Sequence, residues 1–277
     1  MIVDGKMIAR EIEAQVKHAL SALSISPVLA IVIVGEDPVI ENFVRMKKKA
    51  GMALGVLVRE YRFSGTVSEG EVVAVVLALS ENKDVHGIIV QLPLPKHIDP
   101  QAVLDAIPVG KDVDVLSFAS VSAFARGDAK VLPPVAGAIQ EILERADVHV
   151  SGKEALVLGH GRLVGIPAAL LLRHNDAHVT VIDRPISDLL EYTRESDIII
   201  SGVGSPGLIT PTMLHEGVVL IDAGTSEEGG RVVGDAEPLC AEIASVFTPV
   251  PGGIGPITIA MIFKNLVLLA QIPRSSS

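Results

Sequence analysis

Hydrophobic and polar residues alternate along the first half of the chain in blocks of two kinds. Residues 28–34 read Val-Leu-Ala-Ile-Val-Ile-Val, an unbroken apolar run that is typical of a strand buried on both faces. Two more strands are predicted at 56–63 and at 87–92, and the second of these is again buried. Apolar residues recur at helical spacing in four other segments, 5–24, 39–54, 68–80 and 99–107. Strands that alternate with helices predict an α/β layer with parallel pairing.

The second half of the chain repeats this alternation. The pattern predicts four strands, at 154–158, 178–183, 197–201 and 218–222. It also predicts four helices, at 135–145, 163–172, 187–194 and 258–270. The order and lengths of these elements match a doubly wound nucleotide-binding domain. The expected fold class is therefore α/β, with a domain boundary between residues 114 and 133.

Composition narrows the classes of protein that fit this pattern. Hydrophobic residues make up 49% of the chain and charged residues 20%, so a large core can form and general disorder is not expected. Aromatic residues are only 3%, which leaves Val, Ile, Leu and Ala to build a core of the kind that covered parallel sheets have. The net charge of −10 argues against a nucleic-acid-binding protein.

The distribution of cysteine and of apolar runs excludes further classes. Cys240 is the single cysteine, so an intramolecular disulfide and a multi-cysteine metal site are excluded, and no metal is expected. Charges, Gly or Pro interrupt each apolar run well before the roughly 18 residues that a membrane span needs. The first residues lack the basic flank and apolar stretch of a signal peptide. A cytoplasmic protein fits these features.

A glycine-rich segment lies between the predicted strand at 154–158 and the helix that follows it. It reads Gly159-His160-Gly161-Arg162-Leu163-Val164-Gly165, a Gly-x-Gly-x-x-x-Gly spacing. Glycines at its start allow the backbone to turn tightly and to approach a pyrophosphate, and the helix start offers N–H groups and its positive dipole end. Glycines also serve ordinary turns, but the strand, the helix and an acid after the next strand together predict a dinucleotide site. Its expected contacts are Gly159, His160, Gly161, Arg162 and Gly165.

That acid is Asp183, which stands where a carboxylate often binds the adenosine ribose hydroxyls. A carboxylate repels a ribose phosphate, so Asp183 favours NAD over NADP. Arg162 and Arg184 could offset this repulsion, or could equally be solvated surface groups. Turns after the two following strands also stand where cofactor-facing loops belong. These turns contain Gly202, Gly204 and Thr225.

Three other segments are distinctive in combination. They are Gln91-Leu92-Pro93-Leu94-Pro95, Lys111-Asp112-Val113-Asp114 and Pro249-Val250-Pro251-Gly252-Gly253-Ile254-Gly255-Pro256. With Asp4-Gly5-Lys6 and Gly234-Asp235, they resemble the bifunctional methylene-tetrahydrofolate dehydrogenase/methenyl-tetrahydrofolate cyclohydrolase family (the FolD family). The resemblance covers nearly the whole chain in the right order.

The resemblance implies a catalytic domain over 1–120, a Rossmann-type NAD(P)-binding domain over 121–256, and a C-terminal helix, 257–277, that returns to the first domain. It implies an enzyme that oxidises methylene-tetrahydrofolate to methenyl-tetrahydrofolate, with hydrolysis of the methenyl form to formyl-tetrahydrofolate as a second activity. The substrate would be a tetrahydrofolate derivative in the cleft between the domains, the cofactor NADP, and the assembly a homodimer.

The resemblance also implies particular site residues. Lys47 matches the catalytic lysine, Gln91 the glutamine beside it, and Asp114 the acid that binds the pterin. Taken from the helix alone, Lys47 would be read as one of three solvated lysines. The family's tyrosine four residues before the lysine is Phe43 here. The glycine-proline loop of the folate site corresponds to Gly252, Gly253, Gly255 and Pro256.

Several positions depart from the family and mark a divergent member. Phe43 lacks the hydroxyl found where water attack is organised, so hydrolysis is the activity that this change affects. Val115 replaces a glycine. The usual Arg-Ser of the cofactor loop is His160-Gly161, and the usual His-Ser is Asp183-Arg184, which removes the expected anchors for the NADP phosphate and agrees with NAD.

Two other functions compete with the folate enzyme. A shikimate-dehydrogenase-like oxidoreductase has a similar two-domain plan, but the segments containing Gln91 and Asp114 favour folate. A non-catalytic homologue could bind folate or nucleotide in a regulatory role. Lys47, Gln91 and Asp114 argue against that loss of catalysis, whereas Phe43 and the altered cofactor loop leave it open.

Overall fold

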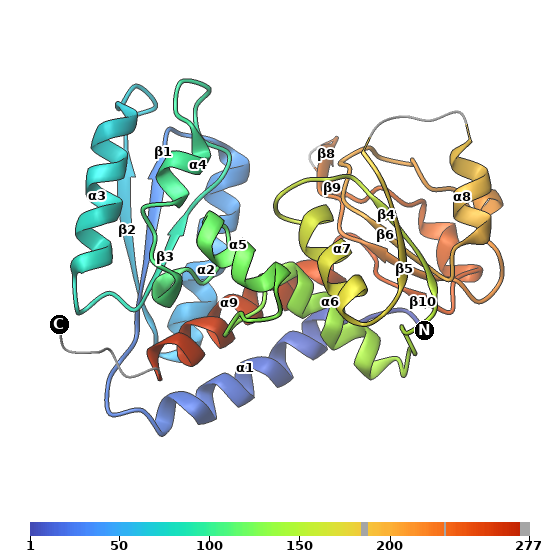
Figure 1. Cartoon of the computed structure of the whole chain (residues 1–277), viewed down its shortest axis with the longest axis horizontal. Helices are drawn as coiled ribbons and strands as arrows, with labels where there is room; N and C mark the ends of the chain where they lie inside the picture. Colours follow the sequence, from blue (N-terminus) through green and yellow to red (C-terminus); the bar gives the residue numbers. More distant parts are fainter. Residues whose placement is uncertain (184–187, 230, 272–277) are drawn as a thin grey trace. The chain divides into compact units, whose positions relative to one another are not determined.

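The computed structural model describes residues 1–183, 188–229 and 231–271. The chain divides into two compact units (Figure 1). The three-stranded unit comprises residues 10–134 and the chain from Ile259 on, and the five-stranded unit comprises Met1–Ala9 and Val135–Thr258. The helices α1 (Gly5–Ser21) and α9 (Ile254–Ala270) each contribute several residues to both units.

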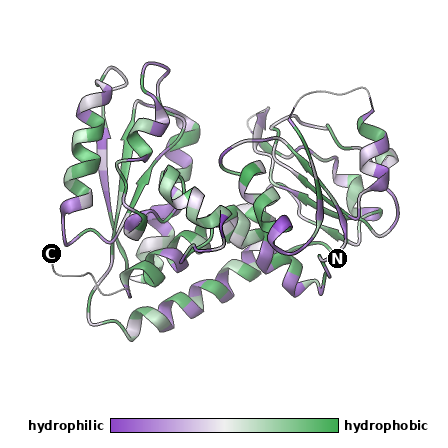
Figure 2. Ribbon diagram, in the orientation of Figure 1, coloured by the Kyte–Doolittle hydropathy of each residue, from purple (hydrophilic) through white to green (hydrophobic). Residues whose placement is uncertain are grey.

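The three-stranded unit is built on a parallel sheet. Strand β1 (Val28–Val34) lies between β2 (Leu57–Phe63) and β3 (Gly87–Val90), and every residue of β1 is buried. Strand β2 is at an edge, alternates between exposed and half-buried residues, and is the most hydrophilic strand of this sheet (Figure 2). The helical segments of the unit include α2 (Pro38–Leu54), α3 (Glu69–Glu81), α4 (Pro100–Leu104), η1 (Val109–Lys111) and α5 (Phe118–Ala125).

Both faces of this sheet are covered by helices. Ala30, Val32 and Val34 of β1 pack with α3 in one hydrophobic cluster. Helix α9 packs on the same unit, where the Asn265 side-chain amide donates to the carbonyl oxygens of Val113 (2.9 Å) and Leu132 (2.7 Å). A C-terminal helix that returns to the first domain was predicted, and this packing confirms it.

The five-stranded unit contains a second parallel sheet with the order β10-β7-β6-β4-β5. Its strands are β4 (Glu154–Leu158), β5 (His178–Ile182), β6 (Ile198–Ser201), β7 (Val219–Asp222) and β10 (Val246–Phe247). Its helical segments include α6 (Pro134–Arg145), α7 (Gly165–His174), α8 (Leu189–Glu195), η2 (Pro211–Met213) and η3 (Pro238–Glu242). An antiparallel hairpin joins β8 (Ser226–Glu228) to β9 (Arg231–Val233). The expected α/β class with a Rossmann-type domain is confirmed.

Some elements differ from those predicted. Helix α9 begins at Ile254 and not at 258, because the first turn of a helix tolerates the proline and the glycine that were read as loop. Helix α5, the β8–β9 hairpin and the two-residue β10 were not predicted. Within the described ranges, no helix is long and apolar enough to cross a membrane.

Candidate active site

Helix α2 carries two of the expected site residues, Phe43 and Lys47. They are four positions apart and therefore lie on one helical face. The helix begins after Asp37, whose side chain accepts hydrogen bonds from the backbone N–H groups of Val39 (2.7 Å) and Ile40 (3.2 Å). This cap sets where the helix starts. The buried face of the helix, which includes Val44 and Leu54, places Lys47 inward.

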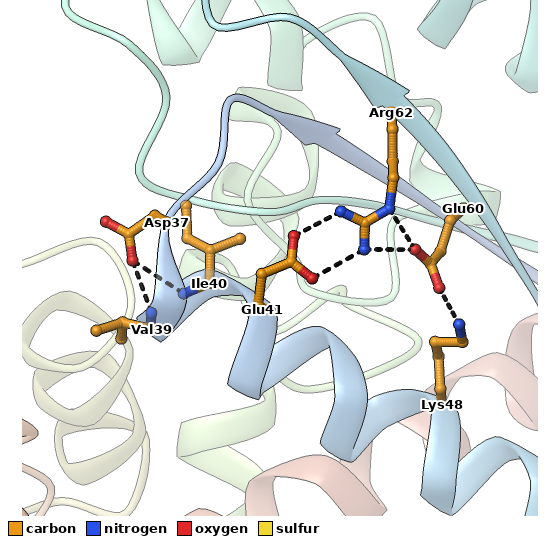
Figure 3. A network of polar contacts seen from close by, with 7 residues as sticks. All are labelled: Asp37, Val39, Ile40, Glu41, Lys48, Glu60 and Arg62. Atoms are coloured by element: carbon orange, nitrogen blue, oxygen red, sulfur yellow. Dashed lines mark hydrogen bonds and ion pairs between the residues drawn. The ribbon is translucent and has the colours of Figure 1, made fainter.

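A chain of ion pairs joins the outer side of α2 to the edge strand β2 (Figure 3). Arg62 Nη2 lies 2.9 Å from Glu41 Oε2 and 2.6 Å from Glu60 Oε2, and Lys48 also pairs with Glu60. Exposed pairs of this kind contribute little to stability, so their main consequence is positional. Lys48 is held on the exposed side of the helix, next in sequence to the buried Lys47.

Lys47 and Gln91 form a buried hydrogen-bonded pair. The Lys47 ammonium donates to Gln91 Oε1 at 2.7 Å, and each residue is 8% exposed. Gln91 follows β3, and its own side-chain amide donates to the Leu92 carbonyl oxygen at 3.1 Å, which orients it. Burial lowers the pKa of Lys47, and Asp114 opposes that shift. The geometry therefore favours a lysine that can both accept and donate a proton.

Asp114 belongs to the same electrostatic group. Burial raises the pKa of this carboxyl to about 6, the nearby Lys47 opposes the rise, and Asp112 adds to it. The residue as a whole is half-buried, so a solvent-accessible part remains. The structure brings Lys47, Gln91 and Asp114 together, as the resemblance implied.

The segment Lys111-Asp112-Val113-Asp114 divides its charged residues between two tasks. The Lys111 ammonium donates to the carbonyl oxygens of Leu79 (3.1 Å) and Asn82 (2.7 Å), at the end of α3. The Asp112 carboxylate accepts from the backbone N–H groups of Leu116 and Ser117, at 3.0 and 2.8 Å. These two residues hold the loop, and Asp114 is the member that acts on Lys47.

The backbone conformation at Val115 is one that favours glycine. The residue has a φ of 57°, in the left-handed region where a β-branched residue is strained by about 1–2 kcal/mol. Its side chain is 3% exposed, so burial of apolar surface offsets part of that strain.

The glycine-rich loop 159–165, predicted to bind the dinucleotide, depends on close backbone approaches in the five-stranded unit. Gly159 has a φ of 95°, and a Cβ on it would lie 2.9 Å from the Gly202 carbonyl oxygen. A Cβ on Gly165 would lie 2.0 Å from the Gly159 carbonyl oxygen, too close for any side chain. The turn after β4, the start of α7 and the turn after β6 therefore fit together only because these residues are glycines.

Asp183 lies at the same edge of the sheet as this loop. Leu158 and Ile182 are opposite each other at the ends of β4 and β5, and the Gly159 N–H donates to the Ile182 carbonyl oxygen at 2.8 Å. Asp183 follows directly and is exposed. Five other expected cofactor contacts follow β4, β6 or β7 and are also exposed, namely His160, Gly161, Arg162, Gly204 and Thr225. Gly159 and Gly202 are half-buried and Gly165 is buried. Arg184 lies outside the described residues.

The glycine-proline loop lies in the five-stranded unit and is anchored to the start of α1. The Gly5 N–H donates to the Gly252 carbonyl oxygen at 3.0 Å, and a Cβ on Gly5 would lie 1.6 Å from the Gly253 carbonyl oxygen. Gly255 and Pro256 lie in the first turn of α9. The opening Asp4-Gly5-Lys6 and this loop, far apart in the sequence, are thus one packed feature.

Two buried acids were given no role from the sequence. Asp222, at the end of β7, and Asp235, after β9, are 1% and 0% exposed and accept hydrogen bonds from the turns around them. Each lies next to or near a glycine, at Gly224 and Gly234, and an acid beside a glycine in a turn is the signal that could have identified them. Among the residues with described positions, no group of three His, Cys, Asp or Glu could hold a metal ion.

Both halves of the chain match family models. The model described as tetrahydrofolate dehydrogenase/cyclohydrolase, catalytic domain, matches residues 3–114, and the model of the corresponding NAD(P)-binding domain matches residues 133–274. The bifunctional protein FolD of Moorella thermoacetica is 42% identical over 275 residues, which is 98% of each chain.

Solved structures of similar proteins share the fold over nearly the full length. The bifunctional enzyme FolD, a methylenetetrahydrofolate dehydrogenase/cyclohydrolase from Campylobacter jejuni, superposes with a TM-score of 0.93 at 33% identity, covering 98% of each chain. The FolD protein of Trypanosoma brucei, complexed with NADP cofactor and inhibitor, gives a TM-score of 0.92 at 33% identity, covering 97% of this chain and 96% of that one.

Proposed function

This chain belongs to the tetrahydrofolate dehydrogenase/cyclohydrolase family, and on that premise we propose that it oxidises methylene-tetrahydrofolate to methenyl-tetrahydrofolate. The observation that carries the proposal is the buried group of Lys47, Gln91 and Asp114, in a chain that also contains an NAD(P)-binding domain. The dinucleotide supplies the acceptor for the hydride that leaves the methylene carbon. The family argues against the shikimate-dehydrogenase-like alternative.

Each residue of the group has a chemical task in this proposal. The Asp114 carboxylate accepts hydrogen bonds from the amino-pyrimidine edge of the pterin. Gln91 holds the Lys47 amine through its side-chain oxygen without adding charge. Lys47, with its lowered pKa, moves the proton when water attacks the methenyl form. The Phe43 ring, half-buried on the same helix, covers the pterin and offers no hydroxyl to that water.

One spectral time course tests the proposal. The protein is mixed with methylene-tetrahydrofolate and either NAD or NADP, and reduced dinucleotide and methenyl product are followed together. Reduced dinucleotide should appear, and methenyl product that accumulates would show a weak cyclohydrolase. If neither dinucleotide is reduced while folate still binds, the non-catalytic homologue becomes the better description.

The fall in dehydrogenase activity at acid pH should reflect the protonation of Asp114. Because its pKa is raised to about 6, we expect kcat/KM for methylene-tetrahydrofolate to be level near pH 7.5 and to fall about tenfold per unit below about pH 6. The protonated carboxyl has lost the charge that holds the pterin edge. Initial rates at saturating dinucleotide measure this, and Asp114→Asn should lower the plateau and abolish the break.

The same shift has a consequence for stability. An acid whose folded pKa lies above its unfolded value stabilises the fold at low pH, and that stability is lost as pH rises from about 4 to about 6. Asp114→Asn should therefore raise the melting temperature at neutral pH while it lowers activity. If the break near pH 6 in the profile of kcat/KM against pH persists in Asp114→Asn, the group that titrates there is not Asp114.

We propose that NAD is the preferred dinucleotide, supported by the exposed Asp183 beside Gly159 at the carboxyl edge of the sheet. A carboxylate a few ångströms from a ribose phosphate costs about 1–4 kcal/mol. Asp183→Asn should then raise the ratio of kcat/KM for NADP over NAD by about tenfold or more. Asp176→Asn is the matched control, because it removes the same charge from the turn before β5, at the other end of that strand. Equal ratios in the two variants would remove Asp183 from cofactor selection.

We also propose that the chain forms the homodimer that the resemblance implies. A groove of about 880 Å³ runs along α2 and the edge strand β2. Its lining includes the apolar Val44 and Val58, the acidic Glu41, and the basic Arg45 and Lys49. A two-fold interface places one patch against itself, so a patch with both charges can pair its acids with bases. Sedimentation velocity measures this, and a particle of one 29.1 kDa chain at micromolar concentration would contradict it.

A further inference from the structure

Asp235 lies at the centre of a buried network in the five-stranded unit. It is 0% exposed, and both of its carboxylate oxygens accept hydrogen bonds from the end of β6 and the residues that follow it. Oδ2 accepts from the Ser201 hydroxyl at 2.6 Å and the Val203 N–H at 2.8 Å, and Oδ1 accepts from the Ser205 N–H at 2.7 Å. Three donors within five residues converge on one carboxylate, so its position sets the shape of the turn 201–205.

The turn 201–205 packs directly against the glycine-rich loop 159–165. A Cβ on Gly202 would lie 2.4 Å from Val164 Cγ1, and the Gly202 carbonyl oxygen is the atom that a Cβ on Gly159 would approach to 2.9 Å. The backbone of the turn is therefore in close contact with the segment 159–165. A shift of the turn by even part of an ångström must displace that segment or open a gap beside it.

A second carboxylate fixes Asp235 itself. Asp222 Oδ1 accepts from the N–H groups of Gly224 (2.9 Å) and Asp235 (3.1 Å), and its Oδ2 accepts from Ala236 at 2.9 Å. A Cβ on Gly224 would lie 2.4 Å from Asp235 Cγ, and a Cβ on Gly234 would lie 2.0 Å from Asp222 Oδ2. The turns after β6 and β7 are thus tied together through two interlocked acids, each facing a glycine.

We infer that Asp235 is a positioning residue for the nicotinamide dinucleotide, holding the turn 201–205 against the glycine loop without itself touching the cofactor. The inference rests on the proposed function, because it assumes that the dinucleotide binds at this edge of the sheet. Carboxylates that accept several backbone N–H bonds make strong, charge-assisted contacts, which suits a rigid support for a binding loop.

Asp235→Asn tests this positioning role. An amide has one oxygen, so at least one of the Val203 and Ser205 N–H groups, which Asp235 holds through different oxygens, would face an NH₂ group. We expect the Kd for the dinucleotide, measured by titration well below the melting temperature, to rise about tenfold or more. The KM for methylene-tetrahydrofolate and kcat at saturating dinucleotide should stay within about threefold. A merely structural role would lower the melting temperature and leave this Kd unchanged.

A milder pair of variants decides the question if Asp235→Asn does not fold. Ser201→Ala removes one donor to Asp235, and Ser245→Ala removes a hydroxyl whose 2.6 Å hydrogen bond goes to Gly217 in the same unit, outside the turn 201–205. Ser201→Ala should raise the dinucleotide Kd about threefold and Ser245→Ala should not. If the Kd is the same in both, the positioning role is wrong. If the unaltered protein binds neither NAD nor NADP, the proposed function fails first, and this inference fails with it.

Discussion

Lys47→Ala should lower the rate of methenyl-tetrahydrofolate hydrolysis by about 10²- to 10⁴-fold, the range typical of a lost general acid or base. The expectation rests on the buried hydrogen bond from Lys47 to Gln91 and on the lowered pKa that burial causes. A solvated lysine would stay protonated near neutral pH, whereas a desolvated one can exchange a proton with attacking water. The loss of methenyl absorbance after direct addition of methenyl-tetrahydrofolate measures this step without the dehydrogenase.

Lys48→Ala is the matched control for this variant. It removes the same kind of charge from the next position of the same helix, where the side chain is 52% exposed and pairs with Glu60. We expect its hydrolysis rate to stay within about threefold of the unaltered protein, since exposed pairs contribute little. Equal losses in the two variants would mean that helix charge, and not the buried amine, is what matters.

The same variant predicts a coupled change in the dehydrogenase. Lys47 opposes the rise in the pKa of Asp114, so its removal should let that pKa move above about 6. The acid limb of kcat/KM for methylene-tetrahydrofolate should then move to higher pH in Lys47→Ala and stay in place in Lys48→Ala. If the acid limb of the kcat/KM profile stays at the same pH in Lys47→Ala, Lys47 and Asp114 do not interact in solution.

The secondary structure could be predicted where one segment carries the whole signal. The strands β1 and β4 were predicted with the bounds that the structure has, because every residue of β1, and every residue of β4 except the exposed Glu154, is buried and apolar. Strand β10, with two residues, and the β8–β9 hairpin were missed, because such short strands are defined by their partners and not by their own sequence. The family resemblance is confirmed by both family models.

Local sequence also predicts only part of the candidate site. Lys47 falls on the helical spacing of the buried residues of α2, whereas Lys48 and Lys49 do not, so the spacing could have indicated which lysine faces inward. It could not indicate the residue that orients Lys47, which is Gln91, 44 positions away. Asp112 and Asp114 look alike in sequence, although backbone N–H groups hold Asp112 and leave Asp114 to act on the lysine. Tertiary contacts assign the roles of Lys47, Asp112 and Asp114, so the resemblance pointed to these roles where the sequence pattern did not.

Gly165→Ala should destabilise the protein and weaken dinucleotide binding together. Its Cβ would lie 2.0 Å from the Gly159 carbonyl oxygen and 3.0 Å from His160 Cα, both backbone atoms that cannot rotate away. Overpacking of this kind costs about 1–3 kcal/mol, which lowers the melting temperature of a chain of this size by about 2–12 °C. Thermal unfolding and dinucleotide titration measure the two effects.

Gly161→Ala separates the structural part of that effect from the binding part. A Cβ on Gly161 meets no atom within 4 Å, and the residue does not need a left-handed backbone, so the melting temperature should stay within about 2 °C. The new methyl group would nevertheless stand where the backbone is expected to approach the pyrophosphate, so affinity for the dinucleotide should fall. Stability lost in Gly161→Ala would mean that the loop packs more tightly than its glycines indicate. Affinity retained in that variant would mean that the pyrophosphate does not approach the backbone at Gly161, and that Gly165 acts through packing alone.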